Sequence, residues 1–211
     1  MTIQSNKYKN IIFDLGGVLL NIDYDVTARA FEKLGISQFH KLFSKAEQNK
    51  TFDLYEKGLI TSDEFRQELN NALKSPVSRE ILDNSWNAML LDLPPARLDL
   101  LKKVKQTHRT FLLSNTNEIH IQWFSNALQQ QIGAPDLSGY FEKVYLSYEI
   151  NLRKPDAEIF QYVLDNNQLD PAETLFIDDS PQHIEGAKKL GIHTYWLDVK
   201  KESIVDIFKG L

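Results

Sequence analysis

The second half of the chain alternates short apolar runs with longer stretches of helical periodicity. These runs predict strands at residues 109–114, 141–147, 174–178 and 193–197, an earlier apolar run predicts one at residues 8–14, and the stretches between the later runs predict helices. Strands that alternate with helices favour a parallel, doubly wound sheet with helices on both faces. The pattern therefore predicts an α/β core of the Rossmann-like type.

A different pattern fills residues 22–93, where apolar residues repeat only at helical spacing. One such stripe follows a capping-box sequence that begins at Thr61. Pro94-Pro95 then ends the helical pattern. We therefore predict an inserted all-helical cap domain at residues 22–93 and a core domain that combines residues 1–21 with residues 94–211.

Acidic residues stand at the ends of two predicted strands. Asp14 follows the run Ile11-Ile12-Phe13 and leads into Gly16-Gly17, and the pair Asp178-Asp179 ends a later strand. A carboxylate at the tip of a buried strand is costly unless it has a partner, and doubly wound sheets bind ligands outside the carboxyl ends of their strands. Two acidic strand ends in one sheet therefore predict a site for a divalent cation.

Two further strand ends carry groups that suit phosphate. Ser114 and Asn115 offer a hydroxyl group and amide donors, and Lys154, just past the strand predicted at 141–147, offers a positive charge. Phosphoryl transfer needs a nucleophile or a positioned water, neutralisation of the phosphate oxygens and usually a metal ion. One chemistry thus uses every member of the set, with Asp14 as both nucleophile and metal ligand.

Each of these residues also has a purely structural interpretation. An aspartate after a strand is often a helix cap or a turn former, Ser114-Asn115 alone is an ordinary turn, and Lys154-Pro155 alone is a solvated lysine before a helix. The pair Asp178-Asp179 is harder to explain in this way, because adjacent carboxylates repel each other without a nearby positive charge. Their joint occurrence at successive strand ends favours the catalytic interpretation.

Four segments of the chain resemble the signature motifs of one superfamily and occur in its order. They are Phe13-Asp14-Leu15-Gly16-Gly17-Val18-Leu19, Leu112-Leu113-Ser114-Asn115, Arg153-Lys154-Pro155-Asp156 and Phe176-Ile177-Asp178-Asp179-Ser180. On these motifs the chain resembles the haloacid dehalogenase-like (HAD) hydrolases, and the predicted cap resembles their small helical cap. Residues 114–117, 146–155 and 55–61 further resemble a bacterial phosphatase branch that includes α-D-glucose-1-phosphate phosphatase.

The resemblance implies a Mg²⁺-dependent phosphatase that acts on a small phosphorylated metabolite, with a sugar phosphate as the expected substrate. By position, Asp14 would attack phosphorus and form an aspartyl phosphate, and Lys154 would neutralise the nucleophile and the transferring phosphoryl group. Ser114 and Asn115 would bind that phosphoryl group. The implied ligands of Mg²⁺ are Asp14, the backbone carbonyl of Gly16, Asp179, and Asp178 directly or through water.

Gly16 departs from the superfamily pattern, because most of its phosphatases carry a second aspartate there as general acid and base. Loss of such a group costs about 10²–10⁴-fold in rate. The resembled branch shares the glycine, and Asp23 or Asp25 would be the nearest proton donors, although both also fit as first residues of a cap helix. A sugar 1-phosphate would need less protonation, because its leaving group is more acidic than an ordinary alcohol.

Three other functions fit parts of the sequence. Carbon–halogen hydrolysis is compatible with Gly16, since dehalogenases of the superfamily also lack the second aspartate, but they usually lack the acidic pair found at Asp178-Asp179. A catalytically degenerate member would bind a phosphorylated ligand or a protein without turnover. Phosphonate cleavage would need a Schiff-base lysine in the cap, for which the candidates are Lys33, Lys41, Lys45, Lys50 and Lys57.

Residues outside the motifs give weaker indications. Phe52, Tyr55 and Leu59 lie near the predicted cap turn, and we expect them to shape substrate specificity. His183 follows the acidic pair, where many relatives carry another acid, and we expect it to be a helix-start residue first and a site-edge residue second.

Composition limits the class of protein. The chain has 211 residues, of which 42% are hydrophobic and 25% charged, enough for a sizeable core. A net charge of −5 without a long basic cluster argues against nucleic-acid binding, and the lack of cysteine excludes disulfides and thiolate chemistry. The polar N-terminus does not resemble a signal peptide, and no apolar run is long enough for a membrane span. We therefore expect a cytoplasmic monomer or weak dimer.

Overall fold

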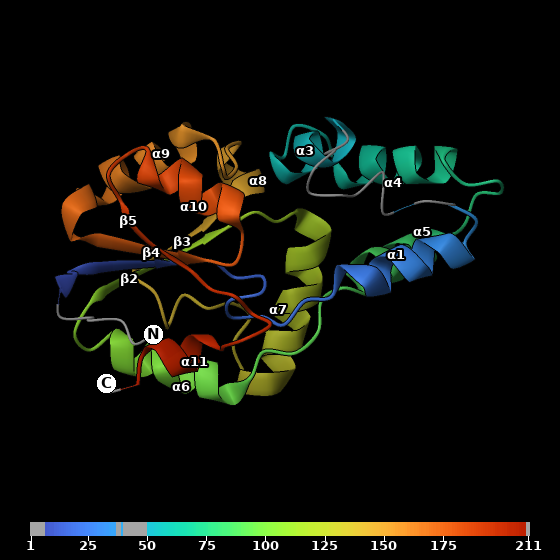
Figure 1. Ribbon diagram of the computed structural model, residues 1–211. Helices are drawn as coiled ribbons and strands as arrows, with labels where there is room; N and C mark the ends of the chain where they lie inside the picture. The colour runs from blue at the N-terminus through green and yellow to red at the C-terminus, as the bar shows by residue number, and fades with distance from the viewer. Residues whose placement is uncertain (1–6, 37–38, 40–49, 210–211) are drawn as a thin grey trace.

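The computed structural model describes residues 7–36, 39 and 50–209, and within them a five-stranded parallel sheet forms the centre (Figure 1). The strands lie in the order β3-β2-β1-β4-β5. Their bounds are β1 Asn10–Phe13, β2 Arg109–Ser114, β3 Lys143–Leu146, β4 Thr174–Asp178 and β5 His193–Trp196. This arrangement confirms the predicted α/β, doubly wound core.

The central strand β1 brings the two acidic strand ends together. Phe13 pairs with Leu112 of β2 on one side and with Ile177 of β4 on the other. Asp14 and Asp178 are the next residues along β1 and β4, and the backbone N–H of Asp14 donates to the carbonyl of Ile177 at 3.0 Å. The register of the sheet therefore places these carboxylates side by side at one edge.

Helices cover both faces of the sheet because successive residues of a strand point to opposite sides. Ile11 and Phe13 belong to one buried cluster with α6, α7 and α11, and Ile12 belongs to another with α9 and α10. Figure 1 shows α6 and α11 on one face and α9 and α10 on the other. The helix bounds are α6 Pro95–Val104, α7 Glu118–Ile132, α9 Ala157–Asn167, α10 Pro181–Lys188 and α11 Ile204–Ile207.

Among the described residues, four helices between β1 and α6 lie to one side of the sheet and form a buried cluster of their own (Figure 1). We call them the cap helices: α1 Tyr24–Lys33, α3 Lys50–Glu56, α4 Ser62–Asn71 and α5 Arg79–Asn87. Phe31, Phe52, Phe65 and Trp86 are central to that cluster, and Ile119 of α7 also belongs to it. The division at residues 22 and 93 stays a prediction.

Local sequence signals explain how several helices begin. Thr61 and Glu64 form the predicted capping box of α4, and Ser78 accepts a hydrogen bond from the backbone N–H of Ile81 at the start of α5. The strand predicted at residues 141–147 is shorter in the structure, because Ser147 already begins a short helix, α8 Ser147–Ile150. Among the described residues, no helix is long and apolar enough to cross a membrane.

Candidate active site

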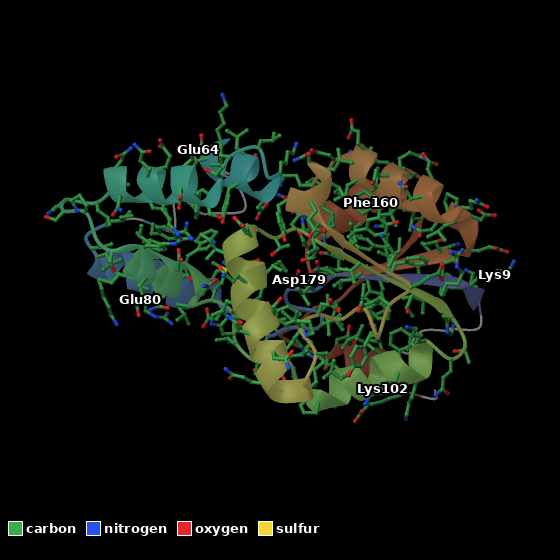
Figure 2. All side chains as sticks on the ribbon, turned by 180° about the vertical axis from the view of Figure 1, so that it is seen from behind. Lys9, Glu64, Glu80, Lys102, Phe160 and Asp179 are labelled. Atoms are coloured by element: carbon green, nitrogen blue, oxygen red, sulfur yellow. The ribbon has the colours of Figure 1, made fainter. Side chains whose placement is uncertain are left out.

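Three carboxylates converge at the carboxyl edge of the sheet. One carboxylate oxygen each of Asp14, Asp178 and Asp179 lies within 4.8 Å of the others. Asp14 and Asp178 are buried, whereas Asp179 is half-buried. Figure 2 shows Asp179 and Lys9 at opposite ends of the sheet, with Asp179 at the end that faces the cap helices.

Lys154 bridges two of these carboxylates with a fully buried side chain. Its Nζ donates to Oδ1 of Asp14 at 2.6 Å, to Oδ2 of Asp178 at 2.7 Å and to the carbonyl oxygen of Leu113 at 2.9 Å. Burial alone would lower the pKa of Lys154, but the two carboxylates outweigh burial and raise it above its usual value. The lysine is therefore charged at the point where the strand ends meet.

The Asp178 carboxylate is bound by protein donors on both oxygens. Oδ1 accepts from the backbone N–H of Ser180 at 2.7 Å, Oδ2 accepts from Lys154, and Nδ1 of His183 lies 3.0 Å from each oxygen. Burial raises the pKa of Asp178, but Lys154 and His183 more than offset burial and hold it at about 2. His183 thus touches the site from the first turn of α10, and its position five residues after Asp178 is the signal in the sequence for this contact.

The Asp14 carboxylate has a different electrostatic balance. Burial, together with the charges of Asp178 and Asp179, raises the pKa of Asp14 to about 7, and the Lys154 ammonium opposes that rise. Lys154 contacts two of the three carboxylates, so negative charge is in excess at this edge of the sheet. A bound cation would supply that charge and favour the ionised form of Asp14.

Asn115 positions Lys154 through its side-chain amide. The amide Nδ2 donates to the carbonyl oxygen of Lys154 at 2.8 Å, and Oδ1 accepts from the backbone N–H of Lys154 at 2.9 Å. The Ser114 side chain is buried beside it, and its hydroxyl donates to the carbonyl of Asn115 at 3.4 Å. The structure thus gives the Asn115 side chain a structural role that the sequence did not indicate, and its role in phosphoryl binding stays a prediction.

The glycine turn after Asp14 leaves room for Asp179. Gly17 has a φ of +81°, and a Cβ atom at this position would lie 2.6 Å from Oδ2 of Asp179. Any larger residue would therefore be strained and would also push the carboxylate away. Gly16 packs against Ile22 instead, since a Cβ atom at Gly16 would lie 3.2 Å from Cδ1 of Ile22.

The donor atoms of this edge fit Mg²⁺ and phosphate. Carboxylate oxygens are the ligands that Mg²⁺ prefers, and Asp14 and Asp179 each place one in the cluster of three. Asp178, with donors on both oxygens, suits an outer role through water. The buried ammonium of Lys154 lies beside Asp14, where it would also meet a phosphate oxygen.

Comparison with known protein families agrees with this geometry. A family model described as haloacid dehalogenase-like hydrolase matches residues 8–191. The chain belongs to the haloacid dehalogenase-like hydrolases. The D-ribitol-5-phosphate phosphatase of Bacteroides thetaiotaomicron is 34% identical over 187 residues, which cover 89% of this chain and 90% of that protein.

Solved structures of HAD proteins resemble the chain to different degrees. A mutant HAD family enzyme from Bacteroides thetaiotaomicron, in complex with magnesium and inorganic phosphate, has a TM-score of 0.86 and 39% identity, and the match covers 92% of this chain and 96% of that chain. L-2-haloacid dehalogenase from Xanthobacter autotrophicus has a TM-score of 0.60 and 19% identity, over 90% and 77% of the two chains. The second likeness shows a common fold alone.

The cap helices of this HAD protein add polar groups that sequence analysis missed. Burial, together with the charges of Asp179, Asp14 and Glu56, raises the pKa of the hydroxyl of Tyr24, the first residue of α1. Asp23 caps α1, and its Oδ1 accepts from the backbone N–H of Asp25 at 2.9 Å. The capping interpretation of Asp23 therefore holds.

The cap residues expected to shape specificity have different surroundings. Phe52 and Tyr55 are buried inside the cap cluster, and the Tyr55 hydroxyl lies 2.8 Å from Oγ of Ser62. Leu59 is exposed, so it stays a prediction as a specificity residue. Among the lysines considered for phosphonate cleavage, Lys57 pairs with Asp156 at 2.8 Å, and Lys41 and Lys45 lie outside the described residues.

Proposed function

We propose that this HAD hydrolase is a Mg²⁺-dependent phosphatase of small phosphorylated metabolites, with sugar and polyol phosphates as its substrates. The observation that carries the proposal is the fully buried Lys154, whose Nζ binds both Asp14 and Asp178 within a cluster of three carboxylates. A pure binding protein has no need of a buried lysine beside an activated carboxylate. A phosphatase with a nucleophilic aspartate does need such a lysine, because its charge stabilises the phosphate oxygens.

Asp14 acts as the nucleophile in this proposal. Lys154 binds Oδ1 of Asp14, which orients the carboxylate so that Oδ2 attacks phosphorus. A bond from Oδ2 to phosphorus forms while the bond from phosphorus to the leaving alkoxide breaks, and an aspartyl phosphate results. Water then attacks phosphorus, inorganic phosphate leaves, and the Asp14 carboxylate is restored.

The other residues hold charge in place during both steps. Mg²⁺ bound by Asp14, the Gly16 carbonyl and Asp179, with Asp178 in the outer role, would neutralise phosphate oxygens. Lys154, whose Nζ lies beside Asp14, would neutralise the same oxygens, and Asn115 fixes the backbone of Lys154. The Ser114 hydroxyl and the backbone N–H of Asn115 are the groups that we assign to phosphoryl binding.

Because Gly16 stands two residues after Asp14, the loop that follows the nucleophile has no acid there to protonate the departing alkoxide. Substrates with an acidic leaving group, such as sugar 1-phosphates, would tolerate this loss best. Esters of simple alcohols, which include polyol phosphates, would need a donor from the cap side. We assign this role to the Tyr24 hydroxyl, because burial and the nearby charges of Asp179, Asp14 and Glu56 raise its pKa and keep it protonated.

Relatives support the substrate class and argue against dehalogenation. A protein named D-ribitol-5-phosphate phosphatase matches nearly the whole chain, whereas the haloacid dehalogenase shares only the fold. The acidic pair Asp178-Asp179 also fits metal-dependent phosphate chemistry better than carbon–halogen hydrolysis. We further propose a cytoplasmic location and a monomer or weak dimer.

Phosphate release over a panel of esters tests the proposed function. The panel contains D-ribitol 5-phosphate, α-glucose 1-phosphate and glyceraldehyde 3-phosphate, each with Mg²⁺. Asp14→Asn and EDTA-treated protein run beside the wild type. Release that disappears in both controls supports the proposal, whereas folded, metal-loaded protein that is silent on the whole panel contradicts it.

A further inference from the structure

Arg153 joins the cap to the core directly beside the catalytic lysine. Its guanidinium is nearly buried, with Nη1 2.7 Å from Oδ1 of Asp53 and Nη2 2.9 Å from Oε2 of Glu56. Asp53 and Glu56 lie three residues apart on α3 and so share one face of that helix. We call Arg153, Asp53 and Glu56 the Arg153 clamp.

The surrounding contacts place the end of α3 firmly against the core. Nζ of Lys57 lies 2.8 Å from Oδ2 of Asp156, and Nδ2 of Asn151 donates to the carbonyl of Lys57 at 2.7 Å. Gly58 has a φ of +63°, and a Cβ there would lie 2.1 Å from the carbonyl oxygen of Tyr148. The backbone of the cap therefore touches the backbone of α8 with no room for a side chain.

One peptide bond separates the clamp from Lys154. The backbone of Lys154 is held on the core side by Asn115, through two hydrogen bonds of 2.8 and 2.9 Å. On the cap side it is held by Arg153, through the two carboxylates of α3. The placement of Nζ against Asp14 thus depends on both anchors.

The electrostatics of the clamp make it sensitive to the loss of its cation. Burial raises the pKa of Glu56, and the Arg153 guanidinium opposes that rise. Without Arg153, Asp53 and Glu56 would be two neighbouring carboxylates with no shared cation, and like charges this close repel. The end of α3 would then move away from the segment that carries Lys154.

We propose that Arg153 is a positioning residue that couples the placement of the cap to the placement of Lys154. The inference rests on the proposed phosphatase function, in which Lys154 stabilises the reacting phosphoryl group. Loss of the clamp misaligns Lys154 and Asp14 without removing either. Lys154 shifts relative to Asp14, so the chemical step slows, while the acidic groups at the ends of β1 and β4 stay in place.

The test compares Arg153→Met and Arg153→Lys with a matched control. Arg79→Met is that control, since Arg79 is exposed and its pairs with Asp63 and Asp83 lie within the cap at 3.9 and 3.8 Å. We expect Arg153→Met to lower kcat by about 10²-fold with little change in KM, since a small misplacement has that effect. Arg153→Lys should lose less because it keeps the positive charge, but it should not match the wild type, because one ammonium cannot reproduce the two-pronged contact. The control should match the wild type.

A triple variant separates positioning from stability. Asp53→Asn and Glu56→Gln, added to Arg153→Met, remove the stranded charges, so the protein should regain stability but keep the low kcat. Amide hydrogen exchange over residues 50–58 should be faster in Arg153→Met than in the wild type, whatever the enzyme turns over. Wild-type kcat in the triple variant, or unchanged exchange, would overturn the coupling. A wild-type protein without phosphatase activity would instead contradict the proposed function. The comparison of amide hydrogen exchange between wild type and Arg153→Met would still test whether the clamp holds α3.

Discussion

Lys154 and Asp178 form an ion pair of 2.7 Å in which neither side chain is exposed to solvent. The same Nζ atom binds Asp14 at 2.6 Å, so one buried charge serves carboxylates from two adjacent strands. A buried pair of this kind adds little net stability, but breaking it is costly because a buried charge loses its partner. The arrangement is therefore better explained by catalysis than by folding.

Replacing Lys154 with methionine should affect both activity and stability. We expect kcat for phosphate release to fall by about 10²–10³-fold, the usual effect of removing one group that stabilises transition-state charge. The free energy of unfolding should fall by about 3–5 kcal/mol, because Asp14 and Asp178 lose their cation. Urea titration and a phosphate assay measure the two effects. Lys188→Met, which alters an exposed pair with Glu185, is the control and should change neither.

His183 should control the metal site through Asp178. The His183→Leu variant loses the contact with both carboxylate oxygens, and partners of this type affect metal affinity by about 10–100-fold. The Mg²⁺ concentration for half-maximal activity should rise accordingly. His183→Asn keeps a donor at a similar position and should recover most of the affinity. If the two variants behaved alike, the hydrogen bond to Asp178 would not matter.

Gly17 should be required for Asp179 to occupy its place. In Gly17→Ala the new Cβ would lie 2.6 Å from Oδ2 of Asp179, so the carboxylate must move. Gly133 is a matched control, since its φ of +71° imposes the same backbone strain but no atom lies within 4 Å of its Cβ position. Both variants should lose about 1–2 kcal/mol of stability from the left-handed backbone. Only Gly17→Ala should also need much more Mg²⁺ for phosphate release.

His120 should make the protein sensitive to acid. Burial lowers the pKa of His120 to about 4, although a hydrogen bond with the Trp86 carbonyl opposes the effect. The unfolded chain binds this proton near pH 6.5 and the folded chain does not, so stability present at pH 7 is lost as the pH falls toward 4. Between pH 7 and 5 the loss is about 2 kcal/mol.

Urea unfolding of wild type and His120→Gln at pH 7 and pH 5 checks this prediction. The difference between the two pH values should be about 2 kcal/mol smaller in the variant. The other titrating groups are the same in both proteins, so their effects cancel in the comparison. An equal pH dependence in both would show that His120 is protonated in the folded state.

The sequence predicted the sheet and the position of the acidic groups well, because both depend on local patterns. Asp14 and Asp178 follow apolar runs, and the parallel register brings the ends of β1 and β4 together. The order of the motifs also predicted the family, and the match to the family model confirms it. Strand ends of a doubly wound sheet meet at one edge whatever the intervening sequence.

Contacts between distant side chains could not be predicted in this way. Arg153 precedes a lysine and a proline and looks like a surface residue, yet its partners lie a hundred residues away on α3. The same holds for Asn115, whose amide binds the Lys154 backbone, and for Tyr24, whose hydroxyl pKa is raised by burial and by the charges of Asp179 and Asp14. Neither periodicity nor a short motif records which side chains meet across two packed layers.

The shared packing of Ile119 has a consequence for transplanting the insertion. Ile119 belongs to α7, which lies outside the inserted helices, but its side chain fills the cap cluster around Phe52 and Trp86. The Tyr55 hydroxyl also accepts from the backbone N–H of Ile119 at 3.3 Å. An excised fragment of residues 22–93 would lack this piece of its own interior. A chimera that moves the insertion into another host should therefore also carry the first turn of α7.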